Sequence, residues 1–484
     1  MIWLALILIP PPEIQPVETP EDVAQWVVTD LLTVPAQDQP FQRYVWVPSW
    51  SSQEWHHAIT FAINASASRS GTIQKPVLVA NGWLQRWDLR QLVQKQEQLD
   101  RLTIVWDSLL ELEPYFHVKG TGVPISTISY RLQPLGDLAD AVGLPVYRGD
   151  WFLVHLLSAI DGGAYQRFRG FAGVNAEGGR TPEERVLSQF GVFEAQAIQV
   201  DGDRRVGMFE SGVTGQSRSV MFLSGLGGYA WITEDVFEGD SGADRSAIHN
   251  LLENNFRGRE IIFELPNGLH GFLITDDKGG ILSEAPPELV SDYTIPDGEP
   301  KRLDGGAISC IRCHASEQGL RTCRNDVAKL LAGPLRVLDD LTVDGNVNAI
   351  DEIATRYSGR KFDRGIRIGR ENYEIAVDEL TGGQMNVEEL SNLVGEIFSQ
   401  YKYGSVTPEI ALRDIGFVVS GEDSPSPVVF FREVVALNQD VGGFRTESPE
   451  IAALYVGDIP IQRFDFERIY PFLLERSIQW RKNR

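Results

Sequence analysis

Five residues near the middle of the chain, Cys310-Ile311-Arg312-Cys313-His314, constrain its fold more than any other stretch. Two cysteines three positions apart, followed at once by a histidine, form the attachment pattern of a covalent c-type haem. On one helical turn the two thiols reach the two vinyl groups of a single porphyrin, and the adjacent imidazole lies under the iron as its proximal ligand. The chain holds only three cysteines and seven histidines, so chance is a poor explanation for the pattern.

Two other chemistries use cysteines at this spacing. A structural zinc site would recruit Cys310, Cys313 and the remaining cysteine, Cys323. Common zinc modules pair two ligand couples, however, and the sequence contains no second CxxC and no HxxxH. A thioredoxin-like redox pair lies between a strand and a helix, and no such context is evident. One covalent haem c is therefore the leading interpretation, and a zinc-binding scaffold is retained as an alternative.

The charge balance restricts the partners of such a chain. Of its 484 residues, 67 are acidic and 44 are basic, which gives a formal net charge of −23. Nucleic acid and anionic lipid repel a protein of this charge, so we expect neither as a partner. An acidic electron carrier instead favours a redox partner with a basic docking face, because complementary charge accelerates encounter.

The first twenty residues differ in composition from the rest of the chain. Residues 1–9 form an apolar leader that is too short to span a bilayer, and a proline-rich tether follows it up to residue 20. The leader is similar to the hydrophobic region of a signal peptide, although it lacks a basic start and a clear cleavage site. No other apolar run reaches spanning length, so we predict no transmembrane span. Because covalent haem is attached outside the bacterial cytoplasm, the motif predicts a periplasmic or otherwise exported protein.

The sequence up to residue 285 predicts two kinds of structure. Residues 21–194 combine helical apolar spacing with short apolar runs, which indicates a mixed α/β domain. Residues 195–285 are β-rich with frequent glycines. Within this segment, Ile261-Ile262-Phe263 and Phe272-Leu273-Ile274 predict two strands that are joined through Asn267-Gly268, a favoured hairpin turn.

Residues 286–306 are rich in proline, glycine and acid, and we interpret them as a linker that leads into the cysteine motif. Residues 307–484 then show apolar residues at helical spacing, for example in Asn348–Tyr357, Glu371–Leu380 and Val387–Tyr401. This pattern predicts a mainly helical haem-bearing domain. The fold class is therefore α+β, with a mixed α/β and β-hairpin N-terminal region before a mainly α-helical, cytochrome c-like region.

Several further stretches resemble one bacterial family. In chain order they are RYVWVPSW, EWHHAITFAIN, YRGDWFLVHLL, SGVTGQSRSVMF, GYAWITEDVFE, ELPNGLHGFLITDDKGG, EAPPELVSD and GGAISCIRCHA. Together they resemble large exported c-type cytochrome proteins of planctomycetes and similar bacteria, from about residue 40 to residue 320. The resemblance implies haem binding and electron transfer, with Cys310 and Cys313 at the thioether positions and His314 as proximal ligand. It implies no sixth ligand and no substrate.

The second axial position of the iron decides whether such a haem only carries electrons or also binds a substrate. Met385 is the one methionine after the motif and no histidine follows His314, so Met385 is the leading candidate for the distal ligand. Its other interpretation is a methionine that fills a gap in the core. Upstream, His270 follows the hairpin turn and His249 lies in a stretch with helical spacing, and an open position is the remaining choice.

Three functions are compatible with these features. The first is monohaem electron transfer. The second is a haem-dependent oxidoreductase with an open distal site, whose pocket would need clusters such as Glu210/Arg218 or Asp276/Asp277, although surface acids on turns explain the latter pair better. The third is a binding or scaffold protein with a structural or gas-sensing haem or a zinc ion. The sequence favours the first and leaves open whether the chain is an enzyme.

Overall fold

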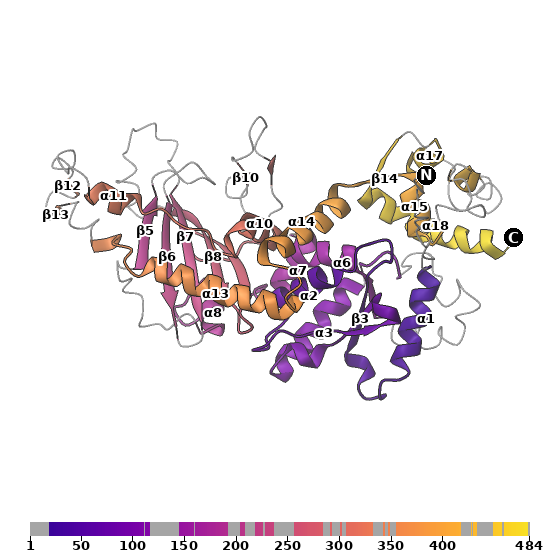
Figure 1. The fold of residues 1–484 in the computed structure, drawn as a ribbon, viewed down its shortest axis with the longest axis horizontal. Coiled ribbons are helices and arrows are strands. Elements are labelled where there is room, and N and C mark those ends of the chain that lie inside the picture. Colours follow the sequence, from indigo (N-terminus) through magenta and orange to yellow (C-terminus); the bar gives the residue numbers. More distant parts are fainter. Residues whose placement is uncertain are drawn as a thin grey trace, which may run out of the picture.

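The computed structural model describes residues 19–110, 112–116, 145–158, 160–191, 204–208, 218–225, 228–236, 256–283, 291–292, 301–302, 306–332, 342–343, 347–348, 355–417, 427, 429–432, 449–456 and 459–482. These residues form an α+β fold, as the sequence predicted. The molecule is elongated, with an N-terminal unit of helices and strands on one side and a large antiparallel sheet on the other (Figure 1). None of the described helices is both long and apolar enough to cross a membrane.

The N-terminal unit is built on a four-stranded sheet in the order β2-β3-β1-β4. Its strands are β1 (Gln42–Trp46), β2 (Val77–Val79), β3 (Leu84–Asp88) and β4 (Val146–Arg148). Its helices are α1 (Pro20–Leu31), α2 (Trp55–Ser66), α3 (Gln96–Leu110), α6 (Gly149–Leu157), α7 (Ile160–Arg169) and α8 (Pro182–Gln189). Short 3-10 turns lie at Gln39–Phe41, Ala80–Gly82 and Leu89–Leu92.

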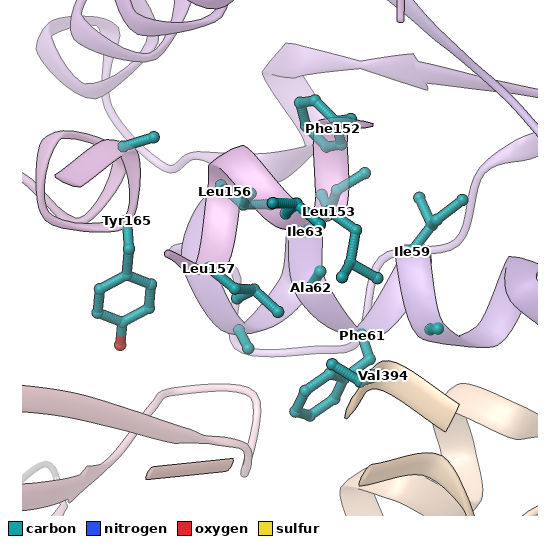
Figure 2. Close-up of a cluster of buried hydrophobic side chains, with 14 of the residues drawn as sticks. Ile59, Phe61, Ala62, Ile63, Phe152, Leu153, Leu156, Leu157, Tyr165 and Val394 are labelled. Atoms are coloured by element: carbon teal, nitrogen blue, oxygen red, sulfur yellow. The ribbon is translucent and has the colours of Figure 1, made fainter. Parts of the chain in front are cut away.

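Helix α2 lies at the centre of the core. Ten of its twelve residues are buried, as expected for a helix that is apolar on all sides. Its neighbours include α6, α7 and a helix from far along the chain, α14 (Val387–Tyr403). Figure 2 shows Val394 of α14 beside Phe61 of α2. The core therefore includes residues from both sides of the predicted linker.

Five antiparallel strands in consecutive order form the second sheet: β5 (Arg205–Met208), β6 (Arg218–Ser224), β7 (Tyr229–Val236), β8 (Phe256–Glu264) and β9 (His270–Asp276). The predicted hairpin is confirmed as the β8–β9 pair, in which Ile262 lies opposite Phe272. Gly268 in its turn has a φ of +82°. Because side chains alternate along a strand, each face of this sheet needs its own cover.

Helix α8 covers one face through Glu183, which accepts hydrogen bonds from Arg259 of β8 and Thr275 of β9. The other face is covered by α13 (Phe362–Thr381), which crosses the strands in Figure 1. Two glycines of α13 make this contact close. A Cβ at Gly365 would come within 2.6 Å of the Phe222 ring, and one at Gly369 within 2.4 Å of Trp231.

The remaining elements follow the predicted linker or lie within it. The helices are α10 (Ala307–Cys313), α11 (Asp326–Ala332), α15 (Pro408–Asp414), α17 (Pro449–Val456) and α18 (Arg463–Lys482), with a 3-10 turn at Ala315–Glu317. Three strand pairs are β10 (Ser291–Asp292) with β11 (Lys301–Arg302), β12 (Thr342–Val343) with β13 (Val347–Asn348), and β14 (Ser405–Val406) with β15 (Ile461–Gln462). The prediction of a helix from Asn348 is wrong at that residue, which pairs with Thr342 in a hairpin. Most of residues 286–306 lie outside the described residues, and the domain boundaries stay predictions.

A buried ionic cluster joins the C-terminal helices to the N-terminal unit. Arg148 of β4 donates to Asp414 of α15 at 2.8 Å, and Arg463 at the start of α18 donates to the same carboxylate. All three side chains are at least nine-tenths buried. Burial alone would raise the pKa of Asp414, but the two guanidinium groups lower it to about 2.

We expect Asp414→Asn to lower the free energy of unfolding by about 3–5 kcal/mol, because it leaves the buried Arg463 guanidinium without the carboxylate that it binds, while Arg148 keeps its ion pair with Asp150. The unfolded carboxyl binds its proton at a higher pH than the folded one. The stabilisation by the Asp414 carboxylate should therefore be lost from the wild type as pH falls from about 4 towards 2. The free energy of unfolding of the variant should lack this part of the pH dependence. Urea unfolding across this pH range measures both effects. Glu97→Gln, which breaks an exposed ion pair on α3, is the control and should cost less than about 1 kcal/mol.

Gly369→Ala should destabilise the fold even though alanine is the better helix former. Overpacking against Trp231 is expected to cost about 1–3 kcal/mol, which exceeds the gain of about 1 kcal/mol in helix propensity. Gly395→Ala in α14 is the matched control, because its Cβ would meet the Arg312 side chain at an ordinary 3.4 Å. The melting temperatures of both variants measure the effect, and Gly369→Ala should have the lower one. Equal or higher stability of Gly369→Ala would contradict the close contact.

Candidate functional site

The cysteine motif lies on α10, with Cys313 as its last residue and His314 as its C-cap. Positions three and four apart lie on the same side of a helix, so Cys310, Cys313 and His314 share one side of α10, as the spacing predicted. The opposite side faces α14, where the Arg312 side chain lies against Gly395. The motif side chains are therefore directed towards the sheet face that α13 covers.

Cys310 is 4% exposed and lies beside Glu260 of β8 and Tyr165 of α7. A small cavity borders it, lined by residues that include Gln166, Phe272 and Leu282. Burial raises the pKa of the Cys310 thiol well above its usual value, and the charge of Glu260 acts in the same direction. The thiol is therefore neutral in the folded chain, whereas a metal ligand must be a thiolate.

His314 is partly buried, and its enclosed Nδ1 has no hydrogen-bond partner among the described residues. Its carbonyl accepts the N–H of Gly319 at 3.1 Å, which closes a tight turn directly after the motif. Burial, together with nearby cationic groups of which Arg321 is the first, lowers the pKa of His314 to about 3. The ring is therefore neutral near pH 7, which is the form in which imidazole binds a metal.

His270, the first residue of β9, lies in the same interior. Its ring is only 1% exposed, and its nitrogens lie close to the backbone of Gly319 and Gly369. It stacks on Tyr373 of α13 with ring centroids 4.3 Å apart, and Trp231 of β7 lies 5.6 Å away. Burial lowers the pKa of His270 to about 3, while the adjacent backbone of Gly319 and Gly369 acts in the opposite direction.

Two features connect His270 with His314. A Cβ on Gly319, whose N–H binds the His314 carbonyl, would come within 2.7 Å of the His270 Nδ1. His270 is also close enough to be one of the groups that lower the pKa of His314. The short turn after the motif thus places the two imidazoles in one buried environment.

The other predicted ligands lie elsewhere. Met385 is in the loop between α13 and α14, where its backbone bonds to the Thr381 hydroxyl and its side chain is partly buried against the core. Thr381 lies eight residues beyond Tyr373 on α13, which is about 12 Å along the helix axis. His249 lies outside the described residues. Of the predicted distal candidates within the described residues, His270 lies against the turn that follows His314.

Burial raises the pKa of Cys323 to about 11, and the three cysteines form no disulfide with one another. The described ranges contain no group of three or more His, Cys, Asp or Glu that could hold a metal ion. Asp276 accepts the backbone N–H groups of Lys278 and Gly280, as expected for an acid that forms a turn. Glu210 lies outside the described residues.

Sequence reasoning missed the residues that surround the imidazoles, namely Tyr373, Trp231 and Gly319. Tyr373 is one of many apolar residues on an amphipathic helix, and nothing in its local pattern separates it from other core tyrosines. The turn at Gly319 could have been predicted from the sequence, because glycine after a polar residue favours a turn with positive φ. Gln318 and Gly319 indeed have φ values of +51° and +82°.

Comparisons of the chain with protein-family models, curated proteins and solved structures find no match. The resemblance to exported c-type cytochromes stays a prediction from the sequence motifs.

Gly319→Ala should destabilise the fold in two ways. A side chain at positive φ costs about 1–2 kcal/mol, and the added Cβ would also displace the His270 ring. Gly382→Ala is the matched control, because Gly382 also has a positive φ, +66°, but a Cβ there would meet nothing within 4 Å. We expect urea unfolding to show a larger loss for Gly319→Ala. Equal losses would contradict a tight contact between the turn and His270.

Proposed function

We propose that the chain is a monohaem c-type cytochrome that transfers electrons. Cys310 and Cys313 would hold the haem by thioether bonds, and His314 would be the proximal iron ligand. The observation that carries this proposal is the shared side of α10, where two cysteines one turn apart lie beside a neutral imidazole with an unpartnered nitrogen. When bound, the haem supplies a reversible one-electron couple.

The residues of the chain would have three tasks at this site. The two cysteines would hold the macrocycle in place, and His314 would offer a lone pair that burial keeps free of a proton. Apolar and aromatic side chains of the sheet and of α13, such as Trp231 and Tyr373, would exclude water. A buried, water-free environment is one of the means by which a protein sets the potential of a haem.

The packing around the motif is closed in this structure. Cys310 is buried and the cavity beside it is small, so the surrounding elements must lie further apart when a porphyrin is attached. We therefore propose that α10 and the sheet are further apart in the haem-bound protein than in this structure. Attachment of this kind is a process of the bacterial cell exterior, and we propose a periplasmic or otherwise exported location. The net charge of −23 supports a redox partner with a basic docking face.

The test is expression of the chain with a periplasmic haem-attachment system, followed by a denaturing gel with haem-peroxidase staining and a pyridine haemochrome spectrum. We expect stain that survives denaturation, and its complete loss in a variant with both Cys310→Ala and Cys313→Ala. Cys323→Ala is the matched control and should keep the full stain, because Cys323 lies outside the motif.

Absence of covalently retained haem in the wild type would defeat the proposal. Retention of a metal that a chelator removes would favour the zinc-binding alternative in its place.

A further inference from the structure

A cluster of arginines lies where α7 packs against α2 and α3. Arg169, the last residue of α7, is fully buried and donates to carbonyl oxygens at the C-terminal end of α2, namely those of Asn64, Ala65 and Ser68. The last carbonyls of a helix have no partner within the helix, and a cation stabilises them. Arg169 therefore has a structural task, and its N–H groups are already used.

Arg69 follows directly on Ser68, and its guanidinium has no such task. The group lies over the ring of Phe190, 4.8 Å from the centroid, and within the described residues its side chain makes no hydrogen bond and no ion pair. Burial lowers the pKa of Arg69 to about 9, and the charges of Arg169 and Arg101 act in the same direction. A partly buried cation without a counter-charge is costly, so this place favours an anion.

Arg101 of α3 adds a second cation beside Gly170, the residue after Arg169. Its guanidinium occupies the space that a Cβ on Gly170 would take, so the glycine permits this approach. In the part of the chain that the structure describes, the Arg101 side chain has one ion pair, with Glu97 at 3.5 Å. Both side chains of this pair are more than two-fifths exposed, and exposed pairs of this kind are weak. Arg101 is therefore available to a stronger anionic partner.

We propose that Arg69 and Arg101 bind a small free oxyanion of the phosphate or sulfate type. A guanidinium group can donate two parallel hydrogen bonds to two oxygen atoms of such an anion. The contact with Phe190 holds Arg69 in place before the anion arrives. Because the Arg101 side chain is 42% exposed, the anion reaches the pair from solvent and no core packing has to open.

The charge of the whole chain decides between a small anion and an anionic surface. The net charge of −23 repels anionic membranes and nucleic acids, which meet a large part of the protein at once. A small anion responds mainly to the nearest cations, because charges beyond about 8–10 Å are screened at physiological ionic strength. The proposed site does not involve the cysteine motif, so the inference is independent of haem binding.

The test is isothermal titration calorimetry of the full-length protein with inorganic phosphate, in a buffer that contains no other oxyanion. We expect saturable binding of one phosphate per chain, and competition by sulfate. Arg69→Met and Arg101→Gln should each weaken the affinity about tenfold or more, because each removes charge-assisted hydrogen bonds. Arg367→Gln on α13 is the matched control, since Arg367 is also exposed and has only a loose pair with Glu371 at 3.9 Å. This variant should bind phosphate as the wild type does.

Melting temperatures separate a binding role of Arg69 from a packing role. Arg69→Met keeps an aliphatic stem over Phe190 and removes the charge that lacks a partner, so without phosphate it should melt no lower than the wild type. Added phosphate should raise the melting temperature of the wild type but not that of the variant. The proposal is overturned if Arg69→Met melts well below the wild type without phosphate, or if it binds phosphate with unchanged affinity. Absence of saturable phosphate binding to the wild type overturns it as well, even if vesicles that contain phosphatidic acid capture the protein.

Discussion

The contact between the backbone of α13 and the aromatic side chains of the five-stranded sheet is the constraint on which the rest of the site depends. Gly365 and Gly369 let Phe222 and Trp231 lie against the helix without an intervening side chain. This close approach places Tyr373, one turn further along α13, on the ring of His270. With a larger residue at Gly369 the helix would stand away from the sheet, and both imidazoles would lose part of their cover.

Burial then sets the charge state of the whole site. It keeps His270 and His314 neutral and holds a proton on the Cys310 thiol, although charged groups such as Glu260 and Arg321 lie close by. Neutral imidazoles are competent metal ligands.

Local patterns predicted the elements that depend on local interactions. The β8–β9 hairpin follows from two apolar runs and the Asn267-Gly268 turn, and α14 follows from helical spacing that begins after Asn386, whose side chain caps the helix at Glu389. Local spacing did not predict how these elements meet. The periodicity of α13 does not predict that it crosses the sheet. From the sequence alone, the glycines that permit this contact are only residues that weaken a helix.

The sequence by itself determined the arrangement of the motif residues at the candidate site. Cys310, Cys313 and His314 are neighbours on one helical turn, so their relation depends only on backbone geometry that the chain repeats in any α-helix. Only the tertiary structure decided that His270 lies against the turn that follows His314. His270, His249 and Met385 are all distant in sequence, and their positions depend on which surfaces bury each other. Packing of β9, α10 and α13 around one apolar interior brought His270 to this place, and long-range burial of this kind leaves no local signature in the chain.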